Sequence, residues 1–137
     1  MEINTTGIQQ ALITLNDALE LHDETDESLL RLRLALRDSI VQRFEYTYEM
    51  SWKLMKRWLS DNVSPEDSEP NWSRRELYRL AAKNGLVDEP KAWFSYHEAR
   101  NVSSHTYDPI SAQKVMDIVK PFAQDVQVLI HRLNSHA

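Results

Sequence analysis

The sequence predicts an all-α fold, an antiparallel bundle of four to five helices. Only two glycines occur, at Gly7 and Gly85, so strands bounded by glycine turns have few places to begin. Apolar residues recur at helical spacing along most of the chain. The 137 residues suit one domain covering positions 1–137, and no internal repeat is visible.

The first helix is expected over residues 7–22. Ile8, Leu12, Leu15 and Leu19 step by four, three and four positions, which places them on one helix face. The acidic stretch HDETDES then interrupts this spacing, so we expect the helix to end there.

Residues 29–59, LLRLRLALRDSIVQRFEYTYEMSWKLMKRWL, contain neither proline nor glycine. This span is longer than one ordinary globular helix, so we expect two helices. The expected break is Arg37-Asp38-Ser39, because Asp and Ser are good N-caps. After it a new apolar stripe begins, comprising Ile40, Phe44, Tyr48, Met55 and Leu59.

Local signals place the remaining helices. DNVSPEDSEPN (61–71) has the composition of a loop, and Ser73 with Glu76 forms a capping box for a short helix ending before Gly85. Pro90 suits the first turn of a helix that extends to about His105, with Trp93, Tyr96 and Ala99 facing inward.

The last helix is expected to begin at Asp108-Pro109, where Asp108 is the N-cap. Pro121 is expected to kink this helix. Its apolar stripe consists of Val115, Val119, Phe122, Val126, Leu129 and Leu133.

Charge and composition narrow the class of protein. The net charge is −5, and residues 1–30 contribute seven acids with no Lys or Arg, which argues against a protein that coats nucleic acid non-specifically. The absence of cysteine excludes disulfides and thiolate metal sites. With no apolar run long enough to span a membrane and no visible secretory signal, we expect a cytoplasmic protein.

The stretch ARNVSSHTYD, residues 99–108, concentrates polar side chains where a helical pattern ends. One interpretation is an ordinary helix terminus, at which Arg and His favour the macrodipole. On a straight helix Arg100 lies about 140° around the axis from His105. The two would converge only if the helix unwinds near His105 or a second molecule completes the site.

These residue types suit RNA cleavage without a metal ion. Imidazole exchanges protons near neutral pH and can serve the 2′-hydroxyl and the leaving group. Guanidinium can stabilise charge on the phosphate, and Asn101 can hold the imidazole or a ribose hydroxyl. DNA lacks the 2′-hydroxyl and would not be cut by this route.

Arg100-Asn101-x-x-x-His105-x-Tyr107 resembles the R-x4-H-x-Y motif of HEPN-type proteins, and specifically the HepT family of toxins paired with a minimal nucleotidyltransferase antitoxin. Close relatives are described as nucleotidyltransferase substrate-binding proteins. IVQRFEYTYEMSWKLMKRWL, residues 40–59, is similar to the long second helix of that family. The resemblance spans roughly residues 35–130 and leaves the acidic N-terminal segment unmatched.

The resemblance implies a HEPN-type bundle that dimerises through its motif helices. It implies that Arg100 and His105 are the catalytic pair of a metal-independent endoribonuclease, supported by Asn101. Tyr107 would accept AMP from the cognate nucleotidyltransferase, which would block the site. The implied partners are that nucleotidyltransferase, RNA and a second copy of the chain, with no cofactor, metal, DNA or membrane.

An alternative is a non-catalytic subunit that presents a substrate to a nucleotidyltransferase. Other candidates have plainer interpretations. Phe44, Tyr48 and Trp52 follow core spacing, and Lys53, Lys56 and Arg57 are interpreted as a solvated basic face. His97 and His105 lie about 12 Å apart along a helix, too far to share a metal ion. Arg43, Glu45 and Glu49 are expected on an exposed, salt-bridged face, and the alternative is that one of them borders the cleft.

Overall fold

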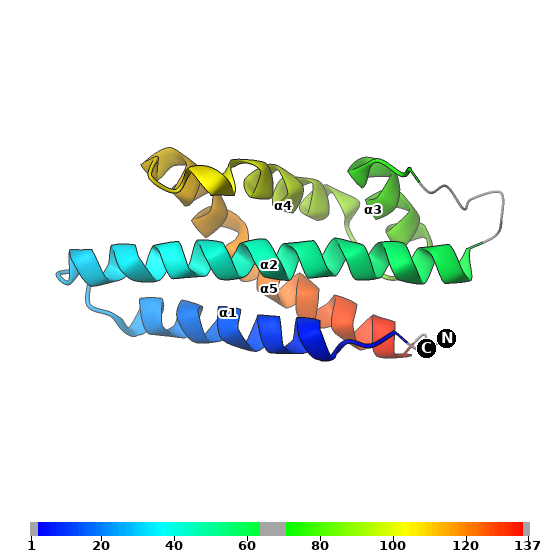
Figure 1. Ribbon diagram of the computed structural model, residues 1–137, viewed down its shortest axis with the longest axis horizontal. Coiled ribbons are helices and arrows are strands. Elements are labelled where there is room, and N and C mark those ends of the chain that lie inside the picture. The colour runs from blue at the N-terminus through cyan, green and yellow to red at the C-terminus, as the bar shows by residue number, and fades with distance from the viewer. Residues whose placement is uncertain (1–2, 64–70, 136–137) are drawn as a thin grey trace.

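Residues 3–63 and 71–135 are described by a computed structural model, and they form a bundle of helices (Figure 1). No strand occurs within these two ranges, which confirms the predicted all-α class. In chain order the elements are α1 (Thr6–Glu24), α2 (Leu30–Asn62), α3 (Arg74–Lys83), α4 (Pro90–Val102), the 3₁₀ turn η1 (Ser103–His105) and α5 (Pro109–Ser135).

Helix α2 is the axis of the bundle. Its 33 residues extend about 50 Å, and α1 lies antiparallel along one side of it (Figure 1). Helices α3 and α4 lie on the opposite side, and α5 packs against α1, α2 and α4. Thr5 Oγ1 donates a 2.9 Å hydrogen bond to Asn134 Oδ1, which joins the beginning of α1 to the end of α5.

The predicted break at Arg37-Asp38-Ser39 is wrong, because α2 continues through it without interruption. Asp and Ser cap a helix only where the chain changes direction, and within an exposed helix their side chains can point into solvent. Arg33 Nη1 donates to the carbonyls of His22 and Thr25 and so ties the first turns of α2 to the end of α1. The long second helix therefore begins at Leu30 rather than at Asp38.

The cap signals of the other helices are confirmed. Ser73 Oγ accepts from the backbone N–H of Glu76, as the capping box predicts. Gly85 adopts the left-handed φ of 80° directly after α3, and α4 begins at Pro90. Asp108 Oδ1 accepts a 3.0 Å hydrogen bond from the N–H of Ile110 and caps α5.

The core is centred on aromatic rings contributed by α2, α4 and α5. Phe122 makes edge-on contacts with Phe44 at 4.8 Å and with Tyr96 at 5.1 Å between ring centroids. These packings stabilise the bundle and hold α4 against α2 and α5. The predicted inward-facing residues of α4 and α5 are buried: Trp93, Tyr96, Ala99, Val115, Val119, Phe122, Val126, Leu129 and Leu133.

Helix α5 continues through Pro121, so the proline does not end the helix, and the kink expected there stays a prediction. Most of the predicted loop 61–71 lies outside the described residues. Among the helices of 3–63 and 71–135, none combines the length and the hydropathy required to cross a bilayer.

Candidate functional site

The motif lies where α4 changes into the 3₁₀ turn η1. Burial of Trp93, Tyr96 and Ala99 fixes the rotation of α4 about its axis. The Tyr96 hydroxyl donates to Asp125 on α5, and burial together with this carboxylate raises the pKa of Tyr96. The end of α4 is therefore held by its neighbours on both α2 and α5, which gives Arg100 a defined position.

Arg100 points toward α2, where two carboxylates receive it. Its Nη1 lies 2.9 Å from Glu45 Oε2, and its Nε donates to Glu49 Oε1 at 3.2 Å. Nη1 also donates to Ser103 Oγ at 3.2 Å, and that hydroxyl donates back to the Arg100 carbonyl. The Arg100 side chain is 30% exposed, so the guanidinium remains open to solvent on one side.

His105 and Tyr107 form a second polar pair beyond the helix end. His105 Nδ1 lies 3.2 Å from the Tyr107 hydroxyl, and the two rings meet edge-on at 5.8 Å. Tyr107 is 83% exposed, which leaves its hydroxyl accessible to a large partner. Arg37 Nη2 on α2 donates to the Thr106 carbonyl at 3.3 Å and holds this turn against the long helix.

Asn101 lies on the α5 side of α4. It is exposed and lines a groove of about 590 Å³ with residues of both helices, namely Ser95, Glu98, Ala99, Val102, Lys114, Asp117 and Ile118. Arg100 by contrast turns toward α2. The two neighbours in sequence therefore face different surroundings.

Within one chain the predicted catalytic residues do not meet. Across the described ranges 3–63 and 71–135, no hydrogen bond or ion pair joins Arg100, Asn101 and His105 to one another. The backbone tightens into a 3₁₀ turn at 103–105 rather than unwinding there, and each side chain takes another partner. Completion of the site by a second molecule stays a prediction.

The carboxylate partners of Arg100 were not identified from the sequence. Glu45 and Glu49 were expected on an exposed, salt-bridged face; the ion pairs are confirmed, but both side chains are half-buried against the motif. Their i, i+4 spacing interrupts the aromatic stripe of α2 and is the one local signal for this pairing. Arg43 also departs from the expected face, since its guanidinium donates to the Thr14 carbonyl on α1.

A buried polar chain next to Glu49 was also missed. The Tyr48 hydroxyl bonds both the Tyr78 hydroxyl and, at 3.0 Å, His97 Nδ1. Burial raises the pKa of Tyr48 and of Tyr78. Burial and the nearby Arg74 guanidinium lower the pKa of His97. These groups join α2, α3 and α4 behind the motif.

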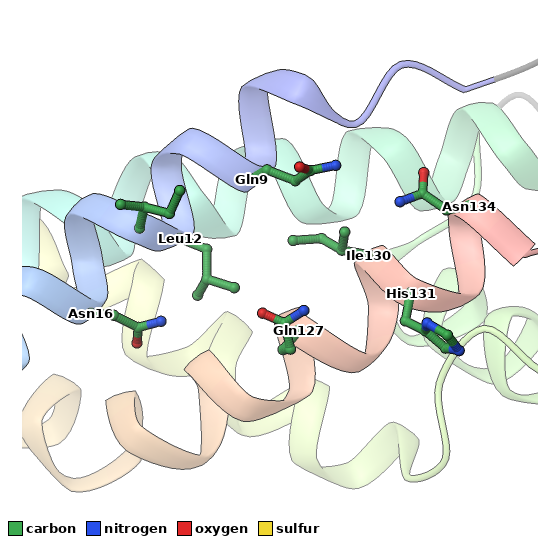
Figure 2. Close-up of a pocket in the computed structure, with 8 residues that line it drawn as sticks. Gln9, Leu12, Asn16, Gln127, Ile130, His131 and Asn134 are labelled. Atoms are coloured by element: carbon green, nitrogen blue, oxygen red, sulfur yellow. The ribbon is translucent and has the colours of Figure 1, made fainter.

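Another hollow, of about 320 Å³, lies between α1 and the end of α5 (Figure 2). The polar side chains that line it are His131 and the neutral amides Gln9, Asn16, Gln127 and Asn134, and the apolar Leu12 and Ile130 are labelled beside them. From Pro109 to Gln127 the α5 axis covers about 27 Å. This hollow is therefore separate from the motif.

Comparisons with known proteins agree on the family and the fold of this chain. The family model described as "Nucleotidyltransferase substrate binding protein like" matches residues 4–135. A Haemophilus influenzae protein named Probable ribonuclease HepT is 32% identical over 93 residues, which are 68% of this chain and 64% of that protein. The match thus spans slightly less than two thirds of the relative's length.

Two solved structures share the fold. One, from Haemophilus influenzae, is described as the substrate binding domain of a nucleotidyltransferase; it has a TM-score of 0.82 at 26% identity and covers 95% of this chain and 98% of its own. A crystal structure from Thermus thermophilus has a TM-score of 0.71 at 27% identity and covers 92% of this chain and 98% of its own. The chain belongs to the family of HepT-like, nucleotidyltransferase substrate binding proteins.

Proposed function

We propose that this protein is a HepT-like toxin that cleaves RNA without a metal ion and is silenced by a nucleotidyltransferase. The single observation that carries the proposal is the placement of Arg100 and the His105–Tyr107 pair at one end of α4, with all three side chains open to solvent at least in part. The ribonuclease name of the Haemophilus influenzae relative supports the same activity.

In the proposed reaction the ribose 2′-oxygen forms a bond to the adjacent phosphorus, and the bond from phosphorus to the 5′-oxygen breaks. His105 takes the 2′-hydroxyl proton, and the leaving 5′-oxygen receives a proton from the resulting imidazolium or from water. Arg100 donates hydrogen bonds to the phosphate as charge develops on its oxygens. Because the two groups do not meet within one chain, we place the scissile phosphate between two subunits.

Tyr107 is proposed as the acceptor of AMP. Its phenol oxygen would bond to the α-phosphorus of ATP, and pyrophosphate would leave. The exposure of Tyr107 supports access by the nucleotidyltransferase active site. The 3.2 Å contact with His105 means that an attached phosphodiester would occupy space beside the imidazole and repel RNA phosphate.

A second candidate function is a non-catalytic subunit that binds a nucleotidyltransferase and presents its substrate. The pairing of Arg100 with two carboxylates favours it, because those contacts already occupy guanidinium donors that a phosphate would need. The description of one solved structure as a substrate binding domain points the same way. Under this proposal the motif serves recognition only.

The chemistry can be tested with two matched oligonucleotides. The purified protein is incubated in EDTA with an RNA and with the same RNA carrying a single 2′-deoxynucleotide at the cleavage position. Transesterification predicts cleavage of the first, with a cyclic phosphate at the new end, and protection of the second at that bond. Cleavage of neither RNA, combined with tight binding of the nucleotidyltransferase, would favour the second function.

A further inference from the structure

Basic side chains stack on aromatic rings along the face shared by α2, α3 and α4. Helix α3 carries four basic residues and one acid. Arg75 and Arg79 place their guanidinium carbons 4.6 and 5.8 Å from the ring centre of Phe94 on α4. Arg74 lies 3.3 Å above Trp52 on α2, and Lys53 Nζ lies 5.7 Å from the same ring. We call these four cations and two rings the arginine–aromatic face.

The arginine–aromatic face is joined to the candidate site by direct contacts. Trp52 Nε1 donates a 3.0 Å hydrogen bond to Glu49 Oε2, and the other oxygen of Glu49 accepts from Arg100 Nε. Along α4, Phe94 precedes Arg100 by six residues, which corresponds to about 9 Å along the axis and about 120° around it, so the two side chains point to different sides of the helix. The face is therefore continuous with Arg100 through Trp52 and Glu49 on α2.

The face has the composition that binds single-stranded nucleic acid. An arginine stacked on a ring keeps its charge, and its donors in the guanidinium plane remain able to bond phosphate oxygens. Stacking also reduces the number of rotamers that binding must immobilise. Arg75, Arg79 and Lys53 are exposed, whereas Glu76, the single acid of α3, is engaged at the helix cap by Ser73.

From this arrangement we infer that the RNA strand flanking the scissile phosphate binds along the arginine–aromatic face, with Arg75, Arg79 and Lys53 contacting its backbone. The inference rests on the proposed ribonuclease function and adds the path of the substrate. Arg74 is half-buried, so it holds Trp52 in place beneath the strand rather than contacting phosphate. An acidic protein surface is the competing occupant, and continuity with Arg100 favours RNA.

The test measures binding of a labelled single-stranded RNA by fluorescence anisotropy between 0.1 and 1 M salt. A non-cleaving His105→Ala protein serves as the background. Each phosphate contact contributes about 0.7 to the slope of log affinity against log salt, or about fivefold in affinity over this range. The Arg75→Gln/Arg79→Gln pair is therefore expected to lower the slope by about 1.4 and to weaken binding at 0.1 M by about 25-fold.

Two matched variants control for charge and for folding. Arg75→Lys/Arg79→Lys keeps both charges and should retain most of the salt slope. Lys120→Gln removes an exposed cation that pairs with Asp23 on the α1–α5 side and should change neither slope nor affinity. Thermal melting of each variant establishes that it is folded.

The outcomes separate this inference from the nuclease proposal. If RNA binds with the expected salt response but the wild-type protein does not cut it, RNA binding by the arginine–aromatic face is supported and the proposed nuclease activity is refuted. If Arg75→Gln/Arg79→Gln cuts RNA at the wild-type rate and binds it with unchanged affinity, RNA binding by this face is refuted and the nuclease proposal stands. If those substitutions instead abolish binding of the nucleotidyltransferase while RNA affinity is unchanged, or if no RNA binds at all, the face does not bind RNA.

Discussion

The two carboxylates that hold Arg100 should be measurable as an energetic coupling. Charges separated by 2.9 and 3.2 Å attract by about 1.4 and 1.3 kcal/mol at the dielectric constant of water. The carboxylates of Glu45 and Glu49 are 27% and 34% exposed, so solvent screening and side-chain ordering reduce each pair to about 0.5–1 kcal/mol. We therefore expect a total coupling of about 1–2 kcal/mol.

The assay is a double-mutant cycle of urea unfolding. The free energy of unfolding is compared for wild type, Arg100→Ala, Glu45→Gln/Glu49→Gln and the triple variant. Arg100→Ala should cost more in the wild-type background, because it leaves two acids one turn apart without their cation. Lys120→Ala provides the matched control, since it breaks an exposed pair with Asp23 and should couple weakly to Glu45 and Glu49.

The same pairing predicts an effect on ligands. An RNA phosphate competes with Glu45 and Glu49 for the donors of Arg100, so Glu49→Gln should bind RNA more tightly than wild type.

In the double-mutant cycle, a coupling free energy within about 0.3 kcal/mol of zero, at both low and moderate salt, would refute the idea that these carboxylates hold the guanidinium.

Three further expectations follow from the same contacts. Tyr107→Phe should retain RNA cleavage yet gain no AMP from the cognate nucleotidyltransferase and ATP, as read by intact-mass spectrometry; AMP on the Phe variant would place the acceptor elsewhere. The lowered pKa of His97 means that the unfolded chain binds its proton more readily, so stability present above about pH 6.5 should fall as the pH drops through the folded pKa. His97→Gln should flatten that part of the urea-unfolding profile, and an unchanged pH dependence would remove His97 as its source. Light scattering should give the mass of a dimer, whereas a monomer at assay concentrations would contradict a site shared between subunits.

Local signals in the sequence were sufficient for most helix ends. The capping box at Ser73, the left-handed Gly85 and the first-turn Pro90 each act through their own backbone, so their positions could be predicted without knowledge of the fold. The predicted helix break at Asp38 was wrong because a local cap signal does not by itself determine where a helix begins. A capping residue permits a helix to begin but does not force one to end, and packing of α2 along α1 and α4 favours one continuous helix.

The candidate site residues could be named from the sequence, and their roles stay a prediction, but their contacts could not be predicted. The motif identified Arg100, His105 and Tyr107 by spacing, and the structure brings His105 and Tyr107 together. The partners of Arg100 lie 51 and 55 residues earlier in the chain, and only tertiary packing of α4 on α2 places them beside it. The hydrogen bonds from Tyr48 to Tyr78 and His97 could not be predicted from the sequence either, because they join three different helices.

The most direct test of the account compares RNA cleavage by wild type, Arg100→Ala and His105→Ala in EDTA, with each protein shown to be folded and of the same oligomeric state. Lys120→Gln serves as a surface control that should cut at the wild-type rate. We expect each motif substitution to lower the rate by at least about 100-fold, the scale at which removal of a general acid–base or a phosphate-stabilising group is felt. Cleavage that persists in both motif variants, or that EDTA abolishes in wild type, would contradict a metal-independent site built on Arg100 and His105.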